Sequence, residues 1–326
     1  MIPMAHRIVL TEKCNKKCPH CFNAEQRKAA KHMDIEKLFN FWIINQHHLK
    51  DAELKIMGGE PTVHPKFLDV SDMGVKLFDA VTLFTNGTKL NIIEHPDILA
   101  SHWTGKYKFI INAFTFDFDE WNRHNKYFRK IGLHFVVPFN TLGNEVQKVI
   151  DKAYQCMSIP QAHFILSGDT QVDIFHEATL DQYRNNYIYF MQSVVPRLKQ
   201  ADIPYSFDHV FPNCFWTQEM IDDLHRYNIG PIHLERQSCC DRILGLLDTN
   251  FDLWYCNQTR LKIGNVLKKD GRPKDLSEVY EVIQKAPMKK TKEVAKYQYT
   301  CRNCRSLTTC KTACWFQHVL PENHTG

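Results

Sequence analysis

The chain has 326 residues, of which 44% are hydrophobic, and a formal net charge of +5. This length is enough for one barrel-sized domain with a small appendage, and the hydrophobic share is that of an ordinary globular protein. No Lys/Arg run is dense enough to form a phosphate-binding stripe, and no apolar run approaches the ~20 residues of a membrane span. We therefore expect neither a nucleic-acid partner nor a membrane-embedded protein.

The cysteine content points to metal rather than to disulfides. Residues 1–7 hold no apolar core of signal-peptide length, so we expect a cytoplasmic protein. In a reducing compartment the 12 Cys are better explained as metal ligands. Their clustering within residues 14–21 and 301–314 supports this interpretation.

Apolar runs alternate with helical periodicity along the first half of the chain. The predicted strands are His6–Leu10, Glu53–Met57, Ala80–Phe84, Lys108–Ala113, His134–Phe139 and His163–Leu166. The predicted helices are Asp34–Leu49, Phe67–Leu77, Asn91–Ala100, Phe118–Phe128 and Glu145–Cys156. Such alternation predicts parallel βαβ units and an α/β fold, with sites at the carboxyl ends of the strands.

The remainder divides into two parts. Residues 167–230 are less regular, with helices predicted over Leu180–Lys199 and Thr217–Tyr227, and are the expected substrate-pocket region. From residue 231 Cys becomes frequent and helical periodicity weakens, as in small units that replace a hydrophobic core with metal. We therefore predict two domains, residues 1–230 and 231–326.

The loop after the first predicted strand holds three thiols, Cys14-x3-Cys18-x2-Cys21. A zinc site or a complete iron–sulfur cluster needs four soft ligands. Either a fourth ligand comes from elsewhere in the chain, or one coordination position is left for a non-protein ligand.

This loop, with Phe22 beside its last Cys, resembles the cluster loop of the radical SAM enzymes. In that family three Cys hold a [4Fe–4S] cluster, and S-adenosylmethionine chelates the fourth iron. Reductive cleavage of the cofactor then gives a 5′-deoxyadenosyl radical that removes a hydrogen atom from the substrate. The resemblance implies these roles for Cys14, Cys18 and Cys21, and a partial (β/α)6 barrel.

A second motif, Gly58-Gly59-Glu60-Pro61, follows the second predicted strand. Paired glycines let a ligand approach the backbone, and a carboxylate can accept a hydrogen bond from an ammonium group. A tight turn with a solvated Glu is the alternative. Following the Cys loop, the motif resembles the one with which the family binds the amino group of the cofactor.

Further cofactor contacts are implied by the same resemblance. They are Asn86 in a Thr-Asn-Gly turn, Asn112 near the ribose, Asn140 on the same rim, and His20 near the adenine. Each Asn is equally well explained as a turn-forming residue.

The C-terminal cysteines, Cys301-x2-Cys304-x5-Cys310-x3-Cys314, resemble the SPASM extension of radical SAM enzymes. Cys240 and Cys256 resemble the pair that opens this extension, and Gly264-Asn265 resembles the turn that follows. The resemblance implies one or two auxiliary [4Fe–4S] clusters in a small Cys-rich domain. A structural zinc site is the alternative, because Cys-x2-Cys with further Cys also suits zinc.

Two departures from that pattern stand out. Phe251 occupies the position of a usual Gly, and no Cys follows Cys314. Either His318 or His324 replaces the last ligand, or that cluster is open or absent. A second cluster would also need Cys214 and Cys239.

The adjacent pair Cys239-Cys240 is a candidate for catalysis. Neighbouring side chains in extended backbone point in different directions, so one thiol can bind a cluster while the other faces the substrate. Small radical SAM epimerases use a Cys in this part of the chain as hydrogen-atom donor. Alternatively, both are ligands or one is buried in the core.

Taken together, the sequence predicts a radical SAM oxidoreductase or epimerase. The first predicted strand begins near residue 6, which leaves no room for an N-terminal leader-peptide-binding domain, so we expect a compact natural product, a sugar-bearing molecule or a short peptide as substrate. The expected reaction is epimerisation or two-electron oxidation, with flavodoxin or ferredoxin as electron donor. The alternatives are cross-linking or thioether formation on a ribosomal peptide, and a zinc-stabilised binding protein without redox activity.

Overall fold

The computed structural model describes residues 5–18, 21, 31–89, 91, 94–137, 143–168, 177–207, 216–226, 243–254 and 262–279. They fall into two compact units. The first comprises residues 1–132 and 242–286, and the second comprises residues 133–241 and 287–326.

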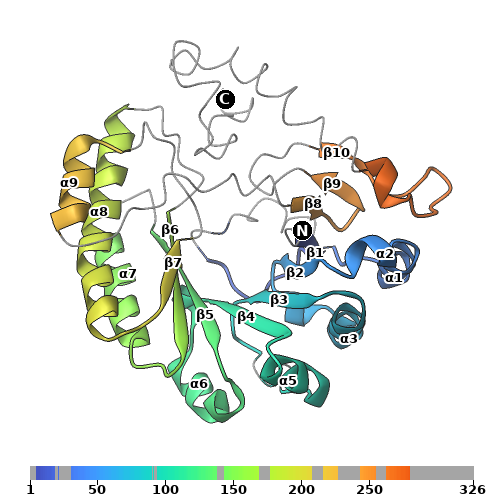
Figure 1. Ribbon diagram of the computed structural model, residues 1–326, viewed down its shortest axis with the longest axis horizontal. Coiled ribbons are helices and arrows are strands. Elements are labelled where there is room, and N and C mark those ends of the chain that lie inside the picture. Colours follow the sequence, from blue (N-terminus) through green and yellow to red (C-terminus); the bar gives the residue numbers. More distant parts are fainter. Residues whose placement is uncertain are drawn as a thin grey trace. The chain divides into compact units, whose positions relative to one another are not determined.

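The first unit is built on a parallel sheet whose strands alternate with helices. The strands are β1 (Ala5–Thr11), β2 (Glu53–Gly58), β3 (Ala80–Thr85) and β4 (Tyr107–Asn112), and they lie side by side in this order. The helices are α1 (Ile35–Ile44), α2 (Gln46–Leu49), α3 (Phe67–Leu77), α5 (Pro96–Trp103) and α6 (Phe118–His124). Helices α1, α3 and α5 lie on one face of the strands (Figure 1). Because the strands are parallel, their carboxyl ends share one edge of the sheet.

Two helix predictions need correction. The helix predicted over Asp34–Leu49 is interrupted at Asn45, whose buried side chain donates to Phe41 O and Lys274 O and accepts from Leu276 N. In the helix predicted over Asn91–Ala100, Asn91 is helical but Glu94 and His95 are not, and α5 begins at Pro96, since proline fits the first turn of a helix. In both cases the apolar periodicity of the sequence predicts one continuous helix, whereas the structure shows a break within it.

A C-terminal segment joins the sheet on its other edge. Strand β8 (Ile243–Leu247) pairs parallel with β1, and β9 (Asp252–Trp254) and β10 (Lys262–Asn265) continue antiparallel from it. Thus β1 lies between β2 and β8. The described part of the predicted auxiliary domain, residues 243–254 and 262–279, belongs to the first unit, and an auxiliary cluster domain over residues 231–326 stays a prediction.

The described part of the second unit holds β5 from Leu133 onward, β6 and β7, with three helices. Strand β5 (Ile131–Val137) is followed by β6 (Ala162–Gly168) and β7 (Tyr205–Phe207) in that order. The helices are α7 (Gly143–Cys156), α8 (Glu177–Gln200) and α9 (Gln218–Arg226). Figure 1 shows α9 beside α8, and α8 also contacts α7.

The six predicted strand–helix repeats are therefore present as β1 to β6 with their helices, which confirms the α/β fold class. Most predicted boundaries agree within two residues, and the predicted helix Phe67–Leu77 coincides with α3. Among the residues that the structure describes, none of the helices is long and apolar enough to cross a bilayer.

Candidate active site

The predicted cluster loop leaves the carboxyl end of β1 and returns to it. Met33 N donates to Leu10 O at 3.0 Å and Glu12 N donates to Lys31 O at 2.8 Å, while Thr11 and His32 form an antiparallel bridge. These bonds close a stem at the base of the predicted cluster loop. The stem fixes where the loop begins and ends, and Cys14, which follows it directly, lies beside the turn after β3.

The Gly58-Gly59 pair makes the second contact with this loop. Gly59 N donates to Thr11 O at 2.7 Å, and Glu60 N donates to Lys13 O at 2.9 Å. A Cβ on Gly58 would lie 2.3 Å from Thr11 O, and a Cβ on Gly59 would lie 2.2 Å from Lys13 O. Since real Cβ atoms do not approach so closely, both positions exclude any larger residue. Glycine is therefore needed at both positions because the backbone of the cluster loop packs against them. The sequence analysis had instead expected a ligand to approach these glycines.

Glu60 is fully buried and its carboxylate is satisfied by the chain itself. Oε1 accepts from Thr62 N at 3.2 Å, Thr62 Oγ1 at 2.6 Å and Thr85 Oγ1 at 2.8 Å. Oε2 accepts from Asn86 N at 2.6 Å. A buried carboxylate needs such donors to offset its lost hydration. Glu60 thus connects the turn after β2 to the turn after β3, and its predicted contact with the cofactor ammonium stays a prediction.

Asn86 lies where these turns meet the cluster loop. Its Nδ2 donates to Asn15 Oδ1 at 2.8 Å and lies 3.8 Å from Cys14 Sγ, within reach of an N–H···S hydrogen bond. Its Oδ1 accepts from Thr88 N at 3.0 Å and Thr88 Oγ1 at 2.6 Å. Its carbonyl accepts from Thr115 Oγ1 at 2.8 Å. The structure therefore brings Asn86 together with the first cluster cysteine.

The three cysteines present a donor set that fits an iron–sulfur cluster. Cys14, Cys18 and Cys21 are all half-buried. Cys14 Sγ receives N–H groups from Lys16 N at 3.4 Å and from Asn86 Nδ2. A thiolate bound to iron is stabilised by such donors, because they disperse its negative charge. Three soft ligands in one loop would leave the fourth iron of such a cluster for an external ligand.

The other predicted site residues are placed less completely. Asn112 ends β4, and its Oδ1 accepts from Phe114 N at 3.0 Å, which makes it the cap of the following turn, η3 (Ala113–Thr115). Asn112 and Asn86 share Thr115, whose Oγ1 donates to both of their carbonyls. His20 and Asn140 lie outside the described residues, as do the predicted auxiliary and catalytic cysteines Cys214, Cys239, Cys240, Cys256, Cys301, Cys304, Cys310 and Cys314.

Two histidines that the sequence analysis did not single out support the stem. His64 Nδ1 accepts from Lys66 N at 3.0 Å, so its Nε2 carries the proton that it donates to Met33 O at 3.2 Å. Burial lowers the pKa of His64, which keeps the ring neutral. His32 packs edge-on against His64, and burial followed by the charge of Lys13 lowers the pKa of His32. The only sequence signal for these two histidines is that they lie close to the predicted motifs, since His64 follows Pro61 by three residues.

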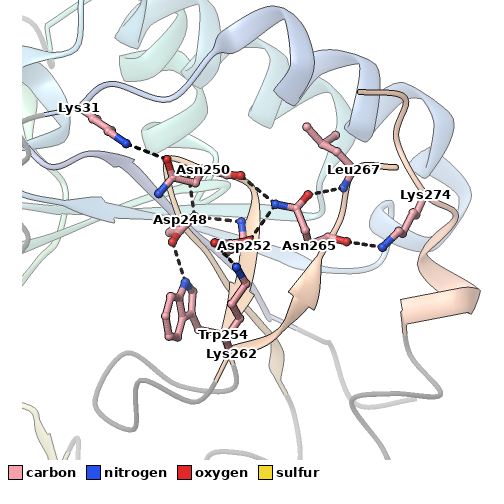
Figure 2. A network of polar contacts seen from close by, with 9 residues as sticks. All are labelled: Lys31, Asp248, Asn250, Asp252, Trp254, Lys262, Asn265, Leu267 and Lys274. Carbon is pink, nitrogen blue, oxygen red and sulfur yellow. Dashed lines mark hydrogen bonds and ion pairs between the residues drawn. The ribbon is translucent and has the colours of Figure 1, made fainter. Parts of the chain in front are cut away.

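The turn between β8 and β9 reaches the same stem from the other side. Thr249 Oγ1 donates to the buried Glu12 Oε1 at 2.9 Å, and Glu12 Oε2 accepts from Lys31 N at 3.2 Å. Lys31 Nζ donates to Asn250 Oδ1 at 3.1 Å (Figure 2). The segment that precedes Cys256 therefore contacts the base of the cluster loop directly.

That turn is held by its own polar network. Asp248 accepts from Asn250 N at 2.8 Å, Asp252 N at 2.9 Å and Trp254 Nε1 at 2.7 Å (Figure 2). Burial raises the pKa of Asp248, although these hydrogen bonds oppose the shift. Asn265, of the predicted Gly-Asn turn, donates to Asn250 O at 3.0 Å and to Asp252 Oδ1 at 2.8 Å. The network joins the turn after β8 to β9 and β10.

Phe251 explains one departure from the family pattern. Its φ is +63°, in the left-handed region that favours glycine, and its side chain is buried. The conformation costs about 1 kcal/mol for a residue with a Cβ. Burying a Phe side chain is worth about 2 kcal/mol, which offsets that cost. A backbone conformation that suits Gly is therefore adopted here by a residue whose side chain packs into the core.

Comparisons with known proteins agree with this geometry. Residues 8–157 match the sequence model of the Radical SAM superfamily. A stretch of 94 residues is 31% identical to AlbA, the antilisterial bacteriocin subtilosin biosynthesis protein of Bacillus subtilis (strain 168). This match covers 27% of the chain and 19% of AlbA, so it spans about a fifth of that relative.

Solved structures of Streptococcus suis SuiB share the fold. SuiB bound to S-adenosylmethionine is 12% identical, with a TM-score of 0.58 over 96% of this chain and 73% of SuiB. A second SuiB structure is 13% identical, with a TM-score of 0.51 over 78% of this chain and 60% of SuiB. A match to this superfamily implies S-adenosylmethionine and one [4Fe–4S] cluster as cofactors. Residues 8–157 are therefore a radical SAM domain.

Proposed function

We propose that this protein modifies a ribosomally made peptide, forming a cross-link or thioether by hydrogen-atom abstraction. The observation that carries the proposal is the 31% identity over 94 residues to AlbA, a bacteriocin biosynthesis protein. This favours the peptide alternative over the compact natural product that the sequence analysis placed first.

The chain's own residues would hold the cofactors at the sheet edge described above. Cys14, Cys18 and Cys21 would bind the cluster, and the turn Gly58–Pro61 would position S-adenosylmethionine. When bound, these cofactors supply the radical that abstracts hydrogen. The two glycines and Glu60 hold that turn against the cluster loop, so they fix the two cofactor sites relative to each other.

The chemistry of cross-linking sets a further requirement. Joining a carbon to a peptide sulfur removes one hydrogen atom from a C–H bond, and one proton and one electron from the partner group. The hydrogen atom leaves in 5′-deoxyadenosine, so the remaining electron needs an acceptor. We propose that Cys301, Cys304, Cys310 and Cys314, with Cys240 and Cys256, bind an auxiliary cluster for this purpose. Flavodoxin or ferredoxin would supply the electron that starts each turnover.

Epimerisation or oxidation of a compact substrate is the second candidate. The adjacent thiols of Cys239 and Cys240 favour it, because a thiol that is not a ligand can return a hydrogen atom to a substrate radical. Epimerisation leaves the substrate mass unchanged and introduces solvent deuterium in D₂O. Cross-linking and oxidation both remove the mass of two hydrogen atoms.

The test uses the full chain, reconstituted anaerobically with iron and sulfide. Peptides encoded by short reading frames next to its gene are incubated with it, S-adenosylmethionine and dithionite. We expect 5′-deoxyadenosine and a peptide lighter by two hydrogen atoms, with one Cys no longer open to alkylation if a thioether forms. Unchanged peptides alongside 5′-deoxyadenosine would contradict the peptide proposal, and a colourless protein with stoichiometric zinc would contradict redox function altogether.

A further inference from the structure

Asn86 has an amide whose orientation the hydrogen bonds determine. Thr88 N can only donate, and it lies 3.0 Å from Asn86 Oδ1. The oxygen therefore faces Thr88, and the NH₂ group faces Asn15 Oδ1 and Cys14 Sγ. One of its two N–H bonds serves Asn15, and the other is directed at the sulfur.

The backbone of Asn86 is equally constrained. Its N–H donates to the buried Glu60 carboxylate and its carbonyl accepts from Thr115 Oγ1, while the residue as a whole is buried. Turning the side-chain amide away from Cys14 would break its own hydrogen bonds to Asn15 and Thr88. The donor is thus held in place before any cluster binds, which is the arrangement that gives a second-layer group its effect on a metal.

The two donors at Cys14 differ in origin. Lys16 N belongs to the loop itself, two residues after the cysteine. Asn86 comes from the turn after β3, and no feature of the Cys-x3-Cys-x2-Cys spacing provides it. A substitution at position 86 removes this donor without changing a residue of the loop, although it also removes the hydrogen bond to Asn15 Oδ1.

We infer that Asn86 is a positioning residue that acts on the catalytic cluster through Cys14, holding this thiolate and raising the cluster's reduction potential. An N–H group directed at a ligating sulfur withdraws charge from it, and so favours the more negative, reduced cluster. This role differs from a direct contact with S-adenosylmethionine. It rests on the radical SAM assignment but on neither proposed substrate.

Two substitutions of Asn86 distinguish an effect on the reduction potential of the cluster from a structural role in the turn after β3. Asn86→Leu removes the donor. Asn86→Asp keeps the size and the acceptor for Thr88, and replaces the donor with a negative charge facing the sulfur. Thr88→Val is the matched control, because it removes the Thr88 hydroxyl from Asn86 Oδ1 and from Asn15 Nδ2, while the donor to Cys14 and the Thr88 N–H remain.

The experiment is an EPR-monitored redox titration of the anaerobically reconstituted full chain. The catalytic cluster is recognised as the one whose signal changes on adding S-adenosylmethionine, and iron retained against a chelator is measured in parallel. We expect a more negative midpoint potential in Asn86→Leu, a further shift in Asn86→Asp, faster iron loss in both, and an unchanged midpoint in Thr88→Val.

The inference is overturned if both Asn86 variants keep the wild-type midpoint, or if Thr88→Val shifts it equally. If Asn86→Leu fails to fold, the comparison of Asn86→Asp with Thr88→Val decides. Wild-type protein without a cluster that responds to S-adenosylmethionine would overturn the radical SAM assignment together with this inference, whereas a responsive wild type with unshifted variants overturns the inference alone.

Discussion

Thr249 Oγ1 donates a hydrogen bond to Glu12 Oε1 at 2.9 Å, joining the turn after β8 to the stem of the cluster loop. The two residues are far apart in the sequence, and Glu12 directly precedes the Lys-Cys start of that loop. The C-terminal segment is thus part of the support of the catalytic loop.

This bond predicts the effect of Thr249→Val. The variant leaves a buried carboxylate oxygen without its donor, so we expect unfolding free energy to fall by about 2 kcal/mol and iron loading of the cluster loop to weaken. Chemical denaturation and iron analysis measure both. Thr104→Val is the control, because the Thr104 hydroxyl bonds only to Ser101 O at an exposed site and should matter by less than about 0.5 kcal/mol. Equal effects at the two sites would refute the support role.

Gly59→Ala tests the close approach of the motif turn to the cluster loop. The added methyl group would meet the Lys13 carbonyl at 2.2 Å, so backbone must move and the Gly59–Thr11 hydrogen bond is strained. We expect loss of most bound iron and of 5′-deoxyadenosine formation. In Gly264→Ala the Cβ meets nothing within 4 Å, and this variant should bind iron as the wild type does. Normal iron content in Gly59→Ala would show that the contact is dispensable.

Glu60→Gln tests the carboxylate that joins the turns after β2 and β3. The new amide directs N–H groups at neighbours that are themselves donors, in a fully buried site. We expect a loss of about 3 kcal/mol in unfolding free energy together with weaker binding of S-adenosylmethionine. Glu36→Gln, on the exposed face of α1, is the control for the change of charge. A Glu60 variant as stable as this control would contradict the buried network.

At position 251 we expect a Gly variant to be more stable than an Ala variant. Both Phe251→Ala and Phe251→Gly lose about 3 kcal/mol of packing, but only Ala retains the strain of a Cβ at φ +63°. The Gly variant should therefore be the more stable by about 1 kcal/mol. At Lys148, on the exposed surface of α7, Ala should instead be the more stable, by about 1 kcal/mol. The same order at both sites would mean that Phe251 is not strained.

Acid stability should depend on His6. This residue is fully buried against Phe41, Trp42 and Phe78, and burial lowers its pKa from 6.5 to about 4. Since the unfolded chain binds the proton more tightly, folding loses free energy as the pH falls from 6.5 to about 4, by up to about 3 kcal/mol. His6→Leu removes this contribution. Denaturation between pH 7 and pH 4 should show a flatter pH dependence in the variant, and parallel curves would contradict it.

The sequence was informative about elements and motifs, and uninformative about how motifs meet. Repeating apolar strands and the Cys spacing predicted the α/β repeats and the cluster loop, because both depend on local pattern. That Gly58 and Gly59 accommodate the backbone of residues 11–13 depends on neighbouring strands, and no local pattern encodes it. The pairing of β8 with β1 has the same origin. Asn45 fitted the predicted helix because two of the three partners of its side chain, Lys274 and Leu276, lie far away in the sequence.

The central claim is that Cys14, Cys18 and Cys21 hold a [4Fe–4S] cluster with one iron open to S-adenosylmethionine. EPR spectroscopy of the anaerobic, dithionite-reduced full chain, with and without S-adenosylmethionine, tests it most directly. We predict a reduced-cluster signal that changes when the cofactor is added, with release of 5′-deoxyadenosine, and loss of both in Cys18→Ala. Absence of any cluster signal, a signal indifferent to the cofactor, or full cofactor cleavage by Cys18→Ala would contradict it.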